Sequence, residues 1–365
     1  MNMNDLKAQA ARAAVWWRSR PGPAIGRIRA RAGVAAAKPE PHGQLRVAVA
    51  QVRAGLCGSA EEFAARMGAF VEEARNRGAV LIVFPEDNGT QLLGMLPGLA
   101  GLAAQIGLTT GGTQAAGATI GEVCRFMSHY TWRAFTAVFA ELAKSYGMYI
   151  VSGSIRRQDP AGRLVNMACC YGPDGRLLGT QEKLHLMQNE TAWGFVPGRD
   201  LTVTEVCGCR LAFPICHDAT YFETFRLALA ADADLVAVQS ANNEDYNEWY
   251  ARRGIWPRVQ ESPVYGLASH LVGDLFGVHL TGRSGVHAPL GLTPAGDGVL
   301  AMAGNPEAEE LIVTDLDLAA LRAWRAANPP SVPGDVVLRY LPELYAEGRR
   351  RASAQENGGA EQERD

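Results

Sequence analysis

Three reactive side chains stand far apart in this chain, each near the end of a predicted buried strand. Glu86 comes just after the continuous apolar run Ala79–Phe84, Lys183 ends a predicted hairpin strand, and Cys216 follows the strand predicted for Arg210–Ile215. A thiol can attack a carbonyl carbon once a base takes its proton, and a nearby ammonium can stabilise the oxyanion that forms. A carboxylate, an ammonium and a thiol brought together therefore predict acyl transfer through a covalent thioester.

The residues around these side chains form three motifs. They are Phe84-Pro85-Glu86, Gln181-Glu182-Lys183-Leu184-His185, and Ile215-Cys216-His217-Asp218 with Glu223 and Arg226 downstream. Their order and surroundings closely resemble the nitrilase superfamily of carbon–nitrogen hydrolases, over roughly Leu45 to Leu316. Phe222 departs from the pattern, since many members have proline before the glutamate. The resemblance implies an α/β fold, an α-β-β-α sandwich of two facing sheets under helices, which becomes four-layered on dimerisation.

The resemblance also assigns catalytic roles. Glu86 takes the thiol proton, gives it to the leaving nitrogen and then activates water, while Cys216 forms the thioester. Lys183 and the backbone N–H of His217 stabilise the oxyanion. Glu190 is the second glutamate, which holds the lysine and orients the substrate. Taken singly, each could be a surface or packing residue, but the three matching motifs argue against that.

Substrate-binding residues are expected near the same strand ends. The candidates are His217, Trp193, Asn242, Tyr246, Trp249 and Trp256. The last four follow the predicted strand Leu235–Ser240, which borders the substrate pocket if the resemblance holds. For the aromatic residues, the alternative is packing in the core.

The residues after the nucleophile bear on which carbon–nitrogen bond is cleaved. True nitrilases commonly carry Trp-Glu directly after the cysteine, whereas this chain has His217-Asp218, closer to the amidase and carbamoylase branches. We therefore expect hydrolysis of a linear amide, with release of ammonia or an amine. Nitriles and N-carbamoyl compounds, cleaved by the same triad, are the alternatives. Arginines available to hold a substrate carboxylate are Arg226, Arg252, Arg253 and Arg258.

Two other kinds of function are open at this point. His185 and His217 adjoin triad members, so a Cys–His thiol hydrolase is conceivable. The fold could also serve as an assembly or binding module without turnover. The intact set of Glu86, Lys183 and Cys216 argues against both.

Charge is unevenly spread along the 365 residues. The net charge is −3, but residues 1–40 hold eight lysines and arginines against two acids, so this arm is +6 and the remainder about −9. A helix predicted over Ala8–Arg20 places Trp16 and Trp17 among arginines and ends at Pro21-Gly22-Pro23. Basic residues interleaved with tryptophan suit an anionic membrane surface. A disordered or dimer-packing arm is the alternative, and a long-chain acyl amide would suit a membrane-facing amidase.

Composition divides the chain into three parts. Residues 1–44 form the basic arm, 45–330 the hydrolase domain, and 331–365 a C-terminal extension with a polar tail that we expect to be disordered. The stretch 88–121 contains no charged residue. It is long enough for a transmembrane helix, but its glycines and polar residues favour an apolar cap near the active site, with membrane contact as the alternative.

Cysteine and histidine usage bounds the compartment and the cofactors. The seven cysteines include pairs too close for ordinary disulfides, which indicates a reduced, cytoplasmic protein, peripheral at the inner membrane face if the arm binds lipid. The histidines show no metal-ligand spacing, and no glycine-rich phosphate loop follows a strand, so we expect no metal and no cofactor. Expected partners are the small-molecule amide and further copies of the chain, in a homodimer or higher homo-oligomer; overall charge gives no indication of nucleic acid.

Hydrophobic periodicity predicts the remaining elements. Further helices are predicted over Ser59–Arg77, Trp132–Tyr146, Tyr221–Ala231 and Leu316–Ala327. Further strands are predicted over Leu45–Val52, Met148–Ile155, Leu164–Tyr171, Arg176–Lys183, Leu201–Val206, Leu235–Gln239 and Glu310–Asp315.

Overall fold

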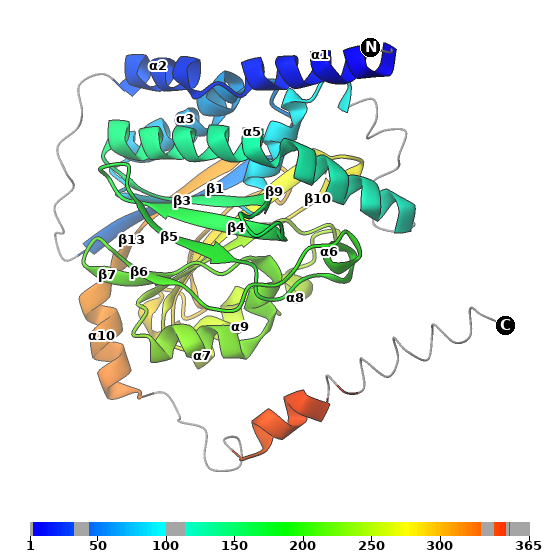
Figure 1. The fold of residues 1–365 in the computed structure, drawn as a ribbon. Coiled ribbons are helices and arrows are strands. Elements are labelled where there is room, and N and C mark those ends of the chain that lie inside the picture. The colour runs from blue at the N-terminus through cyan, green and yellow to red at the C-terminus, as the bar shows by residue number, and fades with distance from the viewer. Residues whose placement is uncertain (1–2, 33–43, 100–113, 330–338, 348–349, 351–365) are drawn as a thin grey trace. The chain divides into compact units, whose positions relative to one another are not determined.

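The computed structural model describes residues 3–32, 44–99, 114–329, 339–347 and 350. The chain divides into two compact units, residues 1–324 and 325–365, and the first contains all the described strands and the candidate site (Figure 1). Residues 33–43 at the end of the predicted arm, residues 100–113 of the uncharged stretch and most of the predicted tail lie outside the described residues. Within the C-terminal extension, residues 339–347 are helical.

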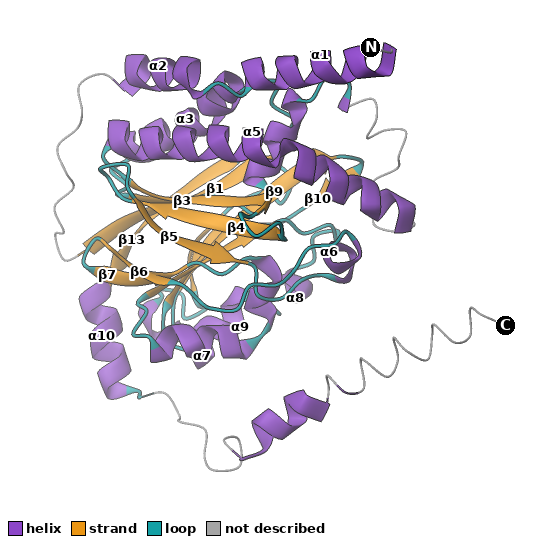
Figure 2. Cartoon of the chain, viewed as in Figure 1, coloured by secondary structure: helices purple, strands orange, loops and turns teal. Residues whose placement is uncertain are grey.

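Thirteen strands of the described residues are connected by hydrogen bonds in one network, which folds into two facing halves that we call the first and the second sheet (Figure 2). The first sheet contains β1 (Gln44–Arg53), β2 (Leu81–Val83), β3 (Tyr149–Gln158), β4 (Leu164–Tyr171), β5 (Leu177–Glu182) and β13 (Glu310–Asp317). The second contains β6 (Val203–Val206), β7 (Cys209–Ala212), β8 (Leu235–Ser240), β9 (Tyr265–Leu275), β10 (Val278–Leu280), β11 (Gly285–His287) and β12 (Val299–Met302). The two sheets meet where the end of β1 pairs in parallel with β9.

Within each sheet, the central strands run parallel and carry the site at their ends. The order in the first sheet is β5-β4-β3-β2-β1-β13, with β1, β2 and β3 parallel. In the second sheet β6-β7-β8-β9 continue to β11 and β12, and β7, β8 and β9 are parallel. The carboxyl ends of parallel strands lie at the same edge of a sheet, where ligands commonly bind.

Helices cover the outer face of each sheet, and the two inner faces pack on each other. Val47, Val49 and Val83 of the first sheet share one buried cluster with Leu211 and Leu267 of the second. The helices are α3 (Ala60–Asn76) and α5 (Gln114–Tyr146) over the first sheet, and α7 (Phe222–Ala230) and α9 (Ile255–Glu261) over the second, as Figure 2 shows. This is the predicted α-β-β-α sandwich. The shorter elements are α6 (Gln188–Ala192), α8 (Glu248–Ala251), α10 (Leu318–Ala327), η1 (Asn88–Met95), η2 (Cys216–Thr220) and η3 (Leu290–Leu292).

The apolar spacing of α3 explains why it forms and where it packs. Phe63, Met67 and Phe70, three to four residues apart, lie on the buried face. Ser59 accepts a hydrogen bond from the backbone N–H of Glu62 at 3.1 Å and so caps the first turn. The helix predicted from this spacing therefore forms.

Strands β9 to β12 were not among the predicted elements. The longest of them, β9, contains Gly266, Ser269 and His270, which interrupt its apolar run. Gly266 is needed there, because a β-carbon would lie 2.6 Å from Val259 of α9. The pattern of β9 reflects contacts with neighbouring elements and not an alternation that a sequence window can detect.

The basic arm forms two helices that pack on the body. They are α1 (Met3–Arg18) and α2 (Pro21–Ala32), so proline begins a second helix, at a position where its missing N–H costs nothing. Val15, Ala24 and Ile28 are buried in the core cluster that includes α3 and α5. The assignment of the arm as a unit apart from the domain stays a prediction, but its helices share this core.

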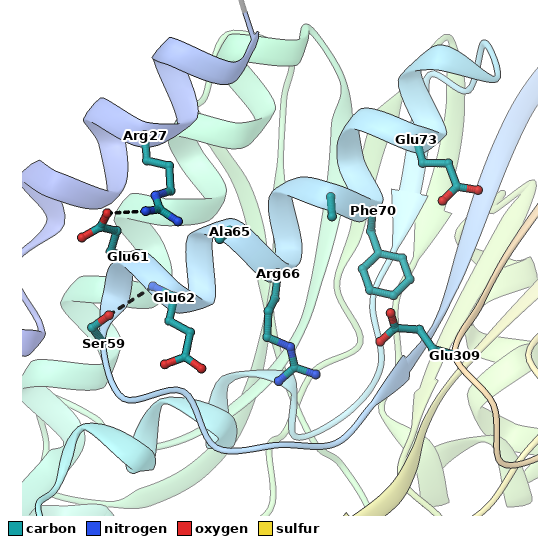
Figure 3. Close-up of a pocket in the computed structure, with 10 residues that line it drawn as sticks. Arg27, Ser59, Glu61, Glu62, Ala65, Arg66, Phe70, Glu73 and Glu309 are labelled. Atoms are coloured by element: carbon teal, nitrogen blue, oxygen red, sulfur yellow. Dashed lines mark hydrogen bonds and ion pairs between the residues drawn. The ribbon is translucent and has the colours of Figure 1, made fainter.

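The arginines of α2 pair with acids on the body. Figure 3 shows Arg27 reaching Glu61 of α3, with 2.8 Å between nitrogen and oxygen, beside a groove of about 620 Å³. Arg29 pairs with Glu141 of α5 at 2.8 Å, and Arg31 pairs with Glu72 of α3. These ion pairs connect α2 to both helices beneath it.

Residues 88–95 of the uncharged stretch are mostly buried. They form the 3₁₀ helix η1, which contacts β3, α5 and α1. No helix in the described residues combines the length and the apolar character that a membrane span requires.

Candidate active site

The three predicted reactive residues converge at strand ends of both sheets. Glu86 follows β2, Lys183 follows β5, and Cys216 begins η2 after β7. All three line a cavity of about 620 Å³. The other predicted site residues that line it are Glu190, Trp193, His217, Asn242, Tyr246 and Trp256. Trp249 is 75% exposed and is not among the residues that line this cavity.

Cys216 occupies a tight turn that presents its side chain to the cavity. Its φ is +48°, in the left-handed region that non-glycine residues rarely adopt. The Sγ lies 3.7 Å from the Oδ1 of Asn242, which follows β8. Burial and the negative charge of Glu86 raise the pKa of the thiol, and Lys183 opposes them. A base must therefore take the proton before the sulfur attacks.

Lys183 is shared between two glutamates. Its Nζ lies 2.8 Å from Glu86 Oε1 and 2.7 Å from Glu190 Oε2, and its side chain is only 2% exposed. Burial alone would lower the pKa of this ammonium, but Glu86, Cys216 and Glu190 outweigh it and raise the pKa. The lysine therefore stays charged and is held in position near the Cys216 thiol.

Glu86 is held by both sheets. Besides Lys183, the side-chain amide of Asn166 on β4 donates to Oε1 at 2.9 Å, and the backbone N–H of Ala241 donates to Oε2 at 3.2 Å. Burial raises the pKa of this carboxyl, although Lys183 lowers it. A carboxylate that binds a proton more readily than usual suits repeated proton transfer near neutral pH.

Asp218 connects the lysine segment to the cysteine turn. Its buried carboxylate accepts the backbone N–H groups of Leu184 and His185 at 3.1 and 2.7 Å, and that of Ile215 at 2.9 Å. One side chain thus fixes the backbone next to Lys183 and next to Cys216. The sequence placed Asp218 in the cysteine motif but gave it no role.

The two neighbouring histidines have other partners. His185 Nδ1 lies 3.0 Å from Asp218, and its ring stacks on Tyr221 at 4.0 Å. His217 Nε2 lies 3.3 Å from the Tyr221 hydroxyl, and burial together with Lys183 lowers the pKa of its imidazole. The geometry thus favours Glu86 over either histidine as the base.

Two glycines allow the backbone to pack closely at the site. Gly153, at φ +75°, lies beside the Glu86 segment, where a β-carbon would be 2.1 Å from the carbonyl oxygen of Pro85. At Gly198 a β-carbon would lie 2.7 Å from Glu182, next to Lys183. Larger residues would displace the very segments that carry the carboxylate and the ammonium.

Comparison with known proteins supports the resemblance. The family model described as "Carbon-nitrogen hydrolase" matches residues 46–326. The chain belongs to the carbon-nitrogen hydrolase family. A Bacillus subtilis relative named "Probable hydrolase YhcX" is 27% identical over 291 residues, which is 77% of this chain but 51% of the relative. The chain thus spans about half the length of that relative. The omega-amidase NIT2 of Pongo abelii is 30% identical over 210 residues, 53% of this chain and 70% of the relative.

Solved structures support the fold. Nit3 of Saccharomyces cerevisiae, a member of the nitrilase superfamily, aligns with a TM-score of 0.58 at 20% identity, covering 82% of this chain and all of that one. A carbon-nitrogen hydrolase from Helicobacter pylori G27 aligns with a TM-score of 0.60 at 19% identity, covering 80% of this chain and 94% of that one. These likenesses show the nitrilase-superfamily fold.

In this member of the carbon-nitrogen hydrolase family a further ion pair adjoins the predicted residues. Arg156 of β3 donates from Nε and Nη2 to the two oxygens of Asp87 at 2.7 and 2.8 Å, and its Nη2 lies 3.4 Å from Glu190 Oε1. Thr90 also donates to Asp87 at 2.9 Å. Burial alone would raise the pKa of Asp87, but Arg156 outweighs it and lowers the pKa. The sequence analysis missed Arg156, Asp87 and Asn166.

The cavity has an apolar side as well as a charged one. Residues of the uncharged stretch contribute Leu93, Leu99 and Ile120, and the region after β9 contributes Phe276. Other apolar residues that line it are Val123, Leu275, Val278, Leu280 and Met302. The cavity thus joins a charged end at Cys216 to a wall suited to an apolar group.

Proposed function

We propose that this carbon-nitrogen hydrolase cleaves a linear amide through a thioester at Cys216. The observation that carries the proposal is the Lys183 ammonium, shared by Glu86 and Glu190, in the same cavity as the thiol. Relatives named omega-amidases support an amide over other carbon–nitrogen bonds, as does the His217-Asp218 pair after the cysteine.

Acylation breaks the carbon–nitrogen bond. Glu86 takes the proton from Cys216, the sulfur bonds to the amide carbon, and the carbonyl electron pair moves onto oxygen. Lys183 and the backbone N–H of His217 stabilise that oxyanion, an effect of about 10²–10³-fold for one donor. When the oxyanion collapses, Glu86 gives its proton to the nitrogen, and ammonia or an amine leaves.

Deacylation repeats the proton transfers with water. Glu86 takes a proton from a water molecule while the oxygen of that water bonds to the thioester carbon. Lys183 again stabilises the oxyanion. The carbon–sulfur bond then breaks, the carboxylic acid leaves, and the Cys216 sulfur recovers a proton from Glu86. The raised pKa of Glu86 favours both directions of transfer, because its carboxyl is neither a very weak base nor a very weak acid.

An amide with an apolar acyl chain is the more specific candidate. The apolar wall formed by Leu93, Leu99 and Phe276 supports this, since burying each methylene group contributes about 0.8 kcal/mol. Under this proposal the reacting carbonyl lies at Cys216 and the chain extends towards Leu93. Activity should then rise with chain length for amides that share one leaving group.

Intact-protein mass spectrometry tests the proposal. The wild type, Cys216→Ala and Cys207→Ala are incubated with amides of increasing chain length, N-carbamoyl compounds and nitriles, and ammonia or amine release is followed. Cys207 is the matched control, because it is also partly exposed and has a positive φ of 52°. We expect an acyl adduct and product release from amides in the wild type and in Cys207→Ala, and neither in Cys216→Ala.

Other outcomes would contradict the proposal in distinct ways. Adducts from nitriles or carbamoyl compounds alone would reassign the bond that is cleaved. Loss of the adduct in a His217→Ala variant but not in Lys183→Met would indicate a Cys–His hydrolase. No adduct and no product with any compound would favour an assembly or binding module.

A further inference from the structure

Helix α1 presents aromatic rings to solvent. Trp16 and Trp17 are 51% and 62% exposed, and Phe126 of α5, also on the surface, is 37% exposed. Arg12 and Arg20 lie over these rings. We call these five residues the α1 surface: Arg12, Trp16, Trp17, Arg20 and Phe126.

The opposite face of α1 fixes its orientation. Val15 and Ser19 are fully buried, and Arg133 of α5 donates to the Ser19 hydroxyl at 3.1 Å. Arg18 donates to the carbonyl oxygen of Met95 in η1 at 3.2 Å. These contacts prevent the helix from turning its tryptophans inward. Arg12 and Trp16 are four residues apart in α1 and so lie on one side of the helix, and Arg20, just after it, lies over the rings of Trp16 and Trp17.

The arginines of the α1 surface differ from those of α2. In α2 the guanidinium groups of Arg27, Arg29 and Arg31 are paired with acids of α3 and α5. Arg12 instead lies 5.9 Å from the ring centre of Phe126, and Arg20 lies 3.2 Å from that of Trp17. Among the described residues neither has an acidic partner, so the α1 surface retains its positive charge.

We propose that the α1 surface docks on an anionic lipid bilayer. Tryptophan rings favour the headgroup region, where their apolar bodies leave water and the indole N–H stays hydrated. The guanidinium groups can reach lipid phosphates while their stems cover the rings. This proposal goes beyond the amide chemistry and does not depend on it. Within the basic arm, the proposal assigns membrane contact to the α1 surface, whereas the ion pairs of α2 hold the arm on α3 and α5.

Vesicle co-sedimentation of the full chain tests the docking. Vesicles contain either phosphatidylcholine alone or equal parts phosphatidylcholine and phosphatidylglycerol. We expect binding to the anionic vesicles and its loss at high salt, because screening shortens the reach of the arginine charges. Trp16→Gln/Trp17→Gln should weaken binding at least about tenfold, by loss of apolar burial. Arg12→Gln/Arg20→Gln should weaken it about thirtyfold, at about fivefold per arginine.

The control removes the same charge from α2. The α2 variant is Arg27→Gln/Arg31→Gln. A second control, Arg12→Lys/Arg20→Lys, retains the charge of the α1 surface. The affinities of these two variants for anionic vesicles should agree within about twofold. Thermal unfolding and turnover of a short soluble amide should be alike in the two α1-surface glutamine variants and the wild type. No vesicle binding by the wild type overturns the proposal, as does equal weakening by the α2 variant. A change in oligomeric state in Trp16→Gln/Trp17→Gln without vesicle binding would instead assign the surface to a second copy of the chain.

Discussion

The protein contains two groups of ion pairs that are formed by similar residue types in different surroundings, one buried at the candidate site and one at the surface. The buried cluster at the active site consists of Glu86, Asp87, Arg156, Lys183 and Glu190. The arm pairs connect α2 to the body: Arg27–Glu61, Arg29–Glu141 and Arg31–Glu72. Lys183 and Glu190 have side chains that are each 2% exposed, whereas Arg27 and Glu61 are 52% and 43% exposed.

In the buried cluster, two residues of the same type differ in pKa. Three carboxylates face two cations there, so one negative charge has no fixed counter-charge. Burial raises the pKa of Glu86, whereas Arg156 and Lys183 outweigh burial at Glu190 and lower its pKa. Under the proposed mechanism this difference suits Glu86 to carrying the proton and Glu190 to remaining an anion. In each arm pair the arginine is exposed, so water and salt screen such differences more strongly there.

Replacing Lys183 should have the largest effect. Lys183→Met removes the oxyanion donor, takes the paired cation from Glu86 and leaves Glu190 with Arg156 alone. We expect kcat to fall about 10³-fold or more. Lys144→Met, at the exposed end of α5, is the control and should retain activity. Single-turnover acylation measures the effect, and a loss below about tenfold would remove Lys183 from the proposed mechanism.

Arg156 should matter next, through stability. Arg156→Met leaves the buried carboxylate of Asp87 without its cation and removes one of the two cations beside Glu190. We therefore expect the free energy of unfolding to fall by about 3–5 kcal/mol. Arg157→Met is the control: its guanidinium lies 3.9 Å from the ring centre of Trp132, a contact of about 0.5–1 kcal/mol. Urea unfolding compares the two. Equal losses would mean that the buried pair contributes no more than a surface contact.

Asp87→Asn should shift the pH dependence of the nucleophile. The charged groups around Glu86 are Lys183, Arg156, Asp87 and Glu190, with Cys216 opposite. Glu86 must be ionised to act as base. Alkylation of Cys216 should therefore slow as pH falls through the raised pKa of Glu86. Asp87 raises that pKa. Removing its charge should therefore move the acid limb to lower pH.

The rate of Cys216 alkylation by iodoacetamide across pH measures this shift. Asp315→Asn, which breaks a surface pair with Arg46, is the control and should leave the limb in place. The limb belongs to the coupled carboxyl and thiol and not to one group alone. A limb that moves to higher pH in Asp87→Asn would show that the cluster does not act on the proton transfer.

The sequence predicted those members of the site that lie just past strand ends. Glu86, Lys183 and Cys216 each come within four residues of the end of a strand, where local pattern and motif agree, and the structure places all three at one cavity. Arg156 and Asn166 lie within strands, where alternation does not tell which face meets the cavity. Their acidic partners are 69 and 80 residues away in sequence, so nothing local marks the pairing.

The same limit applies to the fold. The sandwich followed from the resemblance and from clear strand and helix patterns, but β9 was missed because its composition is set by close neighbours such as α9. The basic character of the arm was evident, yet its division into a paired α2 and an exposed α1 was not. The acids that neutralise α2 belong to α3 and α5, far along the chain.

The smallest expected effect concerns the arm pairs. Arg27→Gln should lower the free energy of unfolding by only about 0.2–1 kcal/mol, because both partners of this pair are exposed. Urea unfolding at low and at high salt separates the two groups of ion pairs. The difference between wild type and Arg27→Gln should shrink at high salt, whereas that for Arg156→Met should persist, since mobile ions do not enter the buried cluster. If the effect of Arg27 persisted and that of Arg156 shrank, the two groups would not be distinguished by burial.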